Sequence, residues 1–305
     1  MPIDNHYFCK MSLTLDKVAP ILQEIFHPIF HQQKLTVKVL RLDLIDPITG
    51  GNKWFKLNFN LEEAKKRSFK TIISFGGPYS NHIAALASAG AKLGFETVGI
   101  IRGQLHDNST LNRARVQGMK LISCDYEKYR GYRNPENWNE LYEQFPESYI
   151  IPEGGSNYLG FQGCKLIAKL IPENTDFVFL PVGTGTTMAG LISSSDNKFS
   201  VEGVAVVKAK DHLNDEVARM IKDDLNSIPQ KYFLHHDFTF GGYAKSDSTL
   251  KSFVEDFCRD TKIPIEPIYT GRMFYAIVAL VNSGYFSKGA SIVAIHTGGN
   301  QYNLS

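Results

Sequence analysis

Two lysines lie three residues apart in the segment GGNKWFKL, directly after a glycine pair. If a helix begins here, Lys53 and Lys56 face the same side of it. A lysine acts as a nucleophile only while its amine is neutral, and burial or a neighbouring cation favours the neutral form. The pair therefore indicates either a covalent lysine supported by a second cation or an ordinary solvated pair at a helix start.

A second stretch, SFGGPYSNHIAA, places Ser80, Asn81 and His82 between a Gly-Gly-Pro turn and an alanine-rich segment. A strand should end at Phe75, and a helix should follow the turn. Free N–H groups at the helix start, with these three side chains, could hold a carboxylate. The alternative is that Ser80 or Asn81 only caps the helix.

The third stretch, LPVGTGTTMAG, is again an apolar strand, a glycine turn and a helix start, here with three threonines. Glycines let backbone amides converge on one anion, so the stretch indicates a phosphate site or, alternatively, a plain strand-to-helix connection. It differs from a dinucleotide-binding loop, because Met188 occupies the place of the third glycine. It also lacks the GK[ST] ending of a Walker loop.

The fourth stretch, EPIYTGRMFY, contains tyrosines that could take part in the chemistry. Tyr269 and Thr270 precede a predicted helix, and Tyr243 lies upstream in GGYAKS. A phenol near a cationic lysine could hold or move a proton, but tyrosines also fill protein cores. Both interpretations stay open on the local sequence.

The elements that must position these residues alternate between short β-branched runs and helix-like segments from Lys70 onward. The order restarts after Gly155, with strands over FVFLPV, VEGVAVVK and SIVAIHTGG. Parallel strands need crossover connections, which helices usually supply. The sequence therefore predicts an α/β protein with parallel-rich open sheets covered by helices.

The bulk composition indicates the number of domains and disfavours several classes of partner. The chain has 305 residues, 43% of them apolar, which suits two joined domains. Its 33 basic and 31 acidic residues nearly cancel, without a basic block, so nucleic acid is a poor candidate partner. The first residues resemble neither a signal peptide nor a membrane span, which predicts a soluble cytoplasmic protein without a membrane partner. The cysteines, His235, His236 and His296 lack metal-ligand spacing, so no metal site is predicted.

Taken in this order, the four stretches resemble the fold-type-II, tryptophan-synthase-beta-like pyridoxal-phosphate enzymes of the 1-aminocyclopropane-1-carboxylate deaminase and D-cysteine desulfhydrase family. The resemblance spans roughly Arg41 to Gly299 and is thin before Arg41, where the family's usual N-terminal segment is abbreviated. It implies pyridoxal 5′-phosphate as the cofactor and a small amino acid as the substrate. It also implies a homodimer.

The resemblance assigns a role to each matched residue. Lys53 corresponds to the lysine that attaches to the cofactor aldehyde, and Lys56 to its supporting cation. Asn81 would bond the ring hydroxyl, and Ser80, Asn81 and His82 would face the substrate. Ser80, as a catalytic residue, would touch the substrate carboxylate or the reacting carbon, and the turn amides would complete the carboxylate site. The phosphate loop corresponds to Gly183, Thr184, Gly185, Thr186 and Thr187.

Tyr243 and Tyr269 match two tyrosines on the substrate side of the family's site, and Thr270 follows the second of them. Deaminase-like sequences carry glutamine at the place of His82 and, at the place of Thr270, a glutamate that faces the pyridine nitrogen. A hydroxyl there gives a weaker electron sink than a carboxylate, which favours elimination of a good leaving group over cyclopropane opening.

We therefore expect D-cysteine-type α,β-elimination to pyruvate, ammonia and hydrogen sulfide. The alternatives are cyclopropane ring opening to 2-oxobutanoate, elimination from another β-substituted amino acid, and a non-catalytic cofactor or amino-acid binder. The resemblance implies a larger cofactor domain over residues 1–57 and 159–305 and a smaller inserted α/β domain over 58–158. The site should lie between them.

Overall fold

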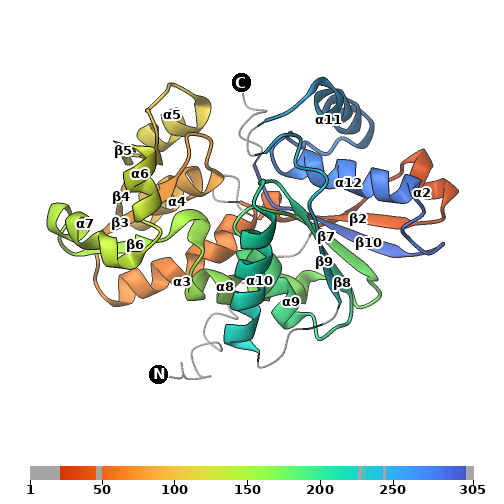
Figure 1. Cartoon of the computed structure of the whole chain (residues 1–305), viewed down its shortest axis with the longest axis horizontal. Coiled ribbons are helices and arrows are strands. Elements are labelled where there is room, and N and C mark those ends of the chain that lie inside the picture. The colour runs from red at the N-terminus through yellow and green to blue at the C-terminus, as the bar shows by residue number, and fades with distance from the viewer. Residues whose placement is uncertain (1–20, 46–49, 226–228, 230, 243–244, 300–305) are drawn as a thin grey trace.

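The structure, a computed structural model, describes residues 21–45, 50–225, 229, 231–242 and 245–299. These residues form two sheets, each with helices on both faces (Figure 1). The predicted α/β class with parallel-rich, helix-covered sheets is confirmed. Within the described ranges, no helix combines the length and the apolar character that crossing a membrane requires.

The larger sheet has six strands in the order β1-β2-β10-β7-β8-β9. In chain order they are β1 (Leu22–Glu24), β2 (Thr36–Arg41), β7 (Phe177–Val182), β8 (Ser200–Ala205), β9 (Tyr232–His235) and β10 (Ser291–His296). Strand β1 pairs antiparallel with β2, and all other neighbours are parallel. The central strands are buried after their first residue, which matches their unbroken apolar runs.

Both faces of this sheet carry a hydrophobic core. One face packs against α8 (Tyr158–Lys165), η4 (Leu166–Leu170), α9 (Thr186–Ser194) and α10 (Lys210–Asp224). The opposite face packs against α2 (Pro28–Gln32), α11 (Ser248–Thr261) and α12 (Thr270–Asn282). Neighbouring residues of β7 alternate between the two cores, with Leu180 in the first and Phe179 in the second.

The smaller sheet has four parallel strands in the order β5-β4-β3-β6. They are β3 (Thr71–Gly76), β4 (Glu96–Arg102), β5 (Lys120–Cys124) and β6 (Ser148–Ile151). One core contains side chains of α3 (Asn52–Lys66), α4 (Asn81–Leu93) and α5 (Ser109–Val116). The core on the other side contains those of α6 (Tyr126–Gly131), η2 (Pro135–Trp138) and α7 (Asn139–Gln144).

Helices α3 and α8 pack against each other where the two halves of the molecule meet (Figure 1). Their backbones approach so closely that a Cβ atom on Gly163 would lie 1.9 Å from the carbonyl oxygen of Phe55. Two short 3-10 turns, η1 (Leu42–Leu44) and η3 (Glu153–Gly155), follow strands β2 and β6. This packing fixes α3, the helix that carries Lys53 and Lys56.

Candidate active site

A cavity of about 830 Å³ opens at the carboxyl ends of strands from both sheets. Its wall includes the first turns of α3 and the segments that follow β3, β6, β7 and β10. Ligands of open α/β folds usually bind at this edge of a sheet, and the volume falls in the usual range of small-molecule sites, roughly 300 to 1,000 Å³. The four stretches singled out in the sequence all reach the cavity wall.

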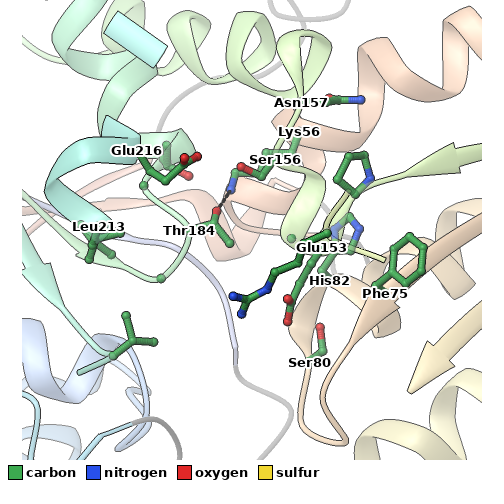
Figure 2. A pocket seen from close by; sticks show the side chains of 18 of the residues that line it. Lys56, Phe75, Ser80, His82, Glu153, Ser156, Asn157, Thr184, Leu213 and Glu216 are labelled. Carbon is green, nitrogen blue, oxygen red and sulfur yellow. Dashed lines mark hydrogen bonds between the residues drawn. The ribbon is translucent and has the colours of Figure 1, made fainter. Parts of the chain in front are cut away.

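The two lysines line the cavity from the start of α3. The predicted helix start is confirmed, and Gly51 makes it possible by adopting a φ of +81°. A Cβ atom at Gly51 would lie 2.0 Å from the carbonyl oxygen of Thr297, so only glycine lets α3 begin against the end of β10. The Nζ atom of Lys53 donates to Asn52 Oδ1 at 3.0 Å. The Nζ atom of Lys56 donates to Thr184 Oγ1 at 3.3 Å (Figure 2).

Burial and the adjacent Lys56 cation lower the pKa of Lys53 to about 7, although Cys164 acts weakly in the opposite direction. Burial also lowers the pKa of Lys56. Near pH 7, about half of the Lys53 amines would be neutral, whereas an ordinary lysine is almost fully protonated there. Lys53 thus has the electrostatic property that a covalent lysine requires.

The glycine-threonine loop forms an anion cradle at the start of α9. Gly185 has a φ of +82°, and a Cβ atom there would lie 2.7 Å from Val217 Cγ2. No side chain caps this helix start, so its N–H groups and dipole are available to an anion. Lys56 adds a positive charge beside the loop through its bond to Thr184 (Figure 2).

A directed chain of hydroxyl groups crosses this cradle. Thr186 Oγ1 donates to Ser156 Oγ at 2.8 Å, so its proton is used, and Thr184 must donate to Thr186 over 3.1 Å. The hydroxyl proton of Ser156 then has no acceptor within the described part of the chain. Separately, Asn52 Nδ2 donates to Thr187 Oγ1 at 2.8 Å and ties the start of α3 to the same loop.

The Ser-Asn-His turn both caps α4 and faces the cavity. Ser80 Oγ caps α4 by accepting from the N–H of Ile83 at 3.4 Å, and Ser80, Asn81 and His82 also line the cavity. Figure 2 shows Ser80 and His82 among the residues of this wall. The amide nitrogen Nδ2 of Asn81 lies 3.0 Å from where a Cβ atom of Gly299 would be. The turn from the smaller sheet thus closely approaches the loop after β10.

His82 is neutral, and its tautomer follows from its neighbours. Ser74 Oγ donates to the carbonyl of Ile151 at 2.7 Å, so the 2.8 Å bond to His82 must run from Nε2–H to Ser74. Nδ1 is therefore an acceptor, and within the described ranges it is buried without a donor. Burial, and then Lys53 and Lys56, lower the pKa of His82 well below its usual value.

The tyrosine stretch reaches the cavity only in part. Tyr269 lines it beside Gly183, whereas Tyr243 falls outside the described residues. Thr270 is fully buried and does not belong to the cavity wall. Its Oγ1 accepts from the N–H of Glu266 at 3.1 Å and donates to Glu266 Oε1 at 3.3 Å.

Sequence reasoning passed over several residues of this site. Glu266 is buried, which raises its pKa, while its carboxylate accepts from the N–H groups of Ile268, Tyr269 and Thr270. Glu266 itself is not on the cavity wall; the wall residues that were not singled out are Asn52, Arg102, Glu153, Ser156, Asn157 and Thr297. The sequence did hold a signal for Ser156 and Asn157. The segment PEGGSN repeats the order of GGPYSN, with a glycine pair followed by a serine and an asparagine. No cluster of three or more metal-binding side chains occurs among the residues described.

A lysine with a lowered pKa, a second cation and an uncapped helix start with threonines suit a cofactor that carries both an aldehyde and a phosphate. Fold and site thus define a pyridoxal-phosphate enzyme. The chain belongs to the family described as pyridoxal-phosphate dependent enzymes, whose model matches residues 27–298. Pyridoxal 5′-phosphate is its cofactor, and the match begins earlier than the Arg41 limit set by the sequence motifs.

Individual relatives indicate which branch of this family the chain resembles. The chain is 30% identical over 280 residues to a Pyrococcus abyssi protein named "Putative 1-aminocyclopropane-1-carboxylate deaminase", covering 86% of this chain and 84% of the relative. It is 28% identical over 283 residues to a bifunctional D-cysteine desulfhydrase/1-aminocyclopropane-1-carboxylate deaminase of Arabidopsis thaliana, covering 83% and 71% of the two chains.

A solved structure, described as that of an ACC deaminase homologue, superposes with a TM-score of 0.83 at 25% identity. It covers 95% of this chain and 94% of its own. The expected fold-type-II class and the resemblance to the deaminase and desulfhydrase family are both confirmed.

Proposed function

We propose that this enzyme eliminates the β-substituent of a small amino acid and releases its nitrogen, with D-cysteine as the preferred substrate. Water and D-cysteine would then give pyruvate, ammonia and hydrogen sulfide. The observation that carries the proposal is the Lys53 amine, which lines a closed-in cavity with a pKa of about 7 beside a second cation. Such an amine can attach to an aldehyde and can also act as a base near neutral pH.

The residues that would hold the cofactor come from both parts of the site. Lys53 would attach to its aldehyde, and Asn81 would bond its ring hydroxyl. Gly183, Thr184, Gly185, Thr186 and Thr187 would cradle its phosphate with Lys56 (Figure 2). When bound, the cofactor supplies a conjugated ring that accepts the negative charge developing on the substrate Cα.

The chain's own groups would then do three things. Once released from its covalent attachment, the Lys53 amine takes the Cα proton, and the nearby Lys56 charge keeps that amine neutral enough to do so. Ser80 and the turn amides orient the substrate carboxylate, because the helix start behind them favours an anion. Tyr269 bounds the substrate space from the larger sheet, and Tyr243 stays a prediction as its partner.

His82 and Thr270 support elimination over ring opening. His82 is a neutral acceptor, and position 270, which lies off the cavity wall, holds a threonine bonded to Glu266 where deaminase-like sequences carry a carboxylate. A site without that carboxylate stabilises negative charge on the ring less strongly, so it suits a substrate whose β-substituent leaves readily. The names of both relatives favour 1-aminocyclopropane-1-carboxylate deamination as the second candidate.

The test is a substrate panel of D-cysteine, L-cysteine, β-chloroalanine and 1-aminocyclopropane-1-carboxylate, with keto acid and sulfide measured separately. We expect the highest kcat/KM for D-cysteine and equal amounts of pyruvate and sulfide. Lys53→Ala should lose activity and the absorbance of the attached cofactor, while Lys65→Ala, on the exposed side of the same helix, should keep both. Keto acid from the cyclopropane substrate alone would refute the preferred reaction.

We also propose the domain division expected from the sequence. All strands of the smaller sheet fall within residues 58–158, and all strands of the larger one fall outside that range. The boundary near residue 58 lies inside α3 and the one near residue 158 at the start of α8, so amide hydrogen exchange is the test: the strands of each sheet should open as one cooperative unit, separately from those of the other sheet. The homodimer and the cytoplasmic location stay predictions, and light scattering of the purified protein tests the first of them.

A further inference from the structure

Arg102 brings a positive charge to the cavity wall on the side of the smaller sheet. It is the last residue of β4, and the parallel register pairs the preceding Ile101 with Gly76 at the end of β3. Arg102 therefore lies beside the turn that leads to Ser80. Its Nη2 atom is 3.4 Å from the position that a Cβ atom on Gly77 would occupy, so the missing side chain leaves the guanidinium room against the turn.

Within the described residues, no carboxylate lies within 4.0 Å of this guanidinium. The guanidinium lies over the ring of Tyr129, 5.6 Å from the ring centroid. The ring supports the flat face of the guanidinium and leaves its N–H groups unused. Glu153 lines the same cavity and forms no ion pair with it. A partly buried guanidinium without a counter-anion is a site for an anion.

The anion that fits is not the cofactor phosphate. The phosphate cradle stands on the larger sheet, where Lys56 already supplies its positive charge. At the turn beside Arg102, by contrast, Ser80 and the start of α4 provide only neutral groups and a helix dipole. Arg102 is the guanidinium beside this turn, so the carboxylate of an amino acid held there would face its positive charge in addition to the charges of the two lysines.

We propose that Arg102 is the counter-charge of the substrate carboxylate and thereby selects free amino acids over their uncharged amides and esters. The inference rests on the proposed amino-acid substrate and on its carboxylate binding at the Ser80 turn. A guanidinium presents two parallel N–H donors to the two oxygens of a carboxylate, which an amide or ester cannot accept in the same way. Arg102 is thus a specificity-determining residue.

The experiment compares the binding of alanine and alaninamide, in both enantiomers, to the cofactor-loaded protein. Neither compound has a β-leaving group, so the change in visible absorbance and the thermal shift report binding without turnover. The variants are Arg102→Gln, which removes the charge, and Arg102→Lys, which keeps it without the planar donors. Arg115→Gln is the matched control, because Arg115 is exposed on α5 outside the cavity.

We expect Arg102→Gln to weaken alanine binding about tenfold or more while alaninamide binding changes less than about twofold, as loss of a charge-assisted hydrogen bond predicts. Arg102→Lys should recover part of the selectivity, and Arg115→Gln should behave as the wild type. Retained cofactor absorbance and melting temperature would show that the variants fold.

The proposal would be overturned if Arg102→Gln weakened the binding of alanine and alaninamide equally, or changed neither. It would also be overturned if the wild-type protein bound neither enantiomer of alanine. A loss seen only with amino acids that carry a second anionic group would also overturn it, and would assign Arg102 to the substrate side chain. Failure of the proposed function is separate from these outcomes. In that case D-cysteine would yield no sulfide while selectivity for alanine over alaninamide still depended on Arg102.

Discussion

The dependence of the Lys53 amine on Lys56 can be tested by Lys56→Gln in the cofactor-free protein. The pKa of Lys53 falls from 10.5 to about 7, a shift of 3.5 units from the difference of the two values. Burial is the largest cause and the Lys56 charge the second, so removing that charge should restore the smaller part of the shift. A like charge close by is typically worth about one unit or more.

The assay is the pH dependence of acylation of Lys53 by a small neutral reagent, followed by mass spectrometry. Only the neutral amine reacts, so the wild-type rate should be half-maximal near pH 7. In Lys56→Gln the midpoint should move upward by about one unit, which lowers the rate at pH 6 about tenfold. Lys65 supplies an exposed lysine in the same helix as an internal reference.

A wild-type midpoint near 10.5 would refute the reasoning, because burial would then not lower the pKa of Lys53. An unchanged or lower midpoint in Lys56→Gln would show that Lys56 does not act through its charge. Because the assay contains no cofactor phosphate, any change in Lys56→Gln reflects the lost charge and not weaker cofactor binding.

Other predictions concern stability and cofactor affinity. Because the pKa of Lys53 is lowered in the folded protein, the unfolded chain binds more protons between pH 7 and 10.5. Lys53→Met should therefore raise the free energy of unfolding of the cofactor-free protein at pH 7 by at most about 5 kcal/mol. Urea titrations should show this gain disappearing as the pH approaches 10.5. Ser156→Ala should weaken cofactor binding about tenfold in equilibrium titrations, because it breaks the hydroxyl chain of the cradle, and an unchanged affinity would contradict that role. Gly163→Val should lower the free energy of unfolding by about 3 kcal/mol in urea, since the added carbons would meet the Phe55 carbonyl.

The sequence predicted those parts of the fold that have strong local signals. Helices α4 and α9 begin where a helix was expected, because a Gly-Gly-Pro turn with a serine cap marks the start of the first and a glycine turn that of the second. Strands β2 and β9 were not singled out. Strand β9 has four residues with histidine at its end, and a run that short has no clear period to separate it from a loop.

The site was predictable where one segment carries the whole signal, as in the two lysines of α3 or the threonine loop. Side-chain contacts were not predictable where they depend on which strands pair and in which register. His235 has no carboxylate near it in the sequence, and only the pairing of β8 with β9 brings its Nε2 to 2.8 Å from Glu202 Oε2. His296 likewise lies 3.4 Å from Asp43 Oδ1, in a segment more than two hundred residues away. Arg102 escaped notice for the same reason, since its place beside Gly77 depends on the register of β3 and β4.

The same pairing explains why the proposed chemistry needs both sheets. Under the proposal, the cofactor phosphate is held by the start of α9 on the larger sheet, while the substrate carboxylate is held by Ser80 and Arg102 on the smaller one. Lys53 stands on α3, which packs against α8 and begins at the end of β10. The position of one sheet relative to the other therefore sets the distance from the Lys53 amine to the substrate Cα. Substitutions at the α3–α8 contact should accordingly reduce kcat more than they weaken cofactor binding.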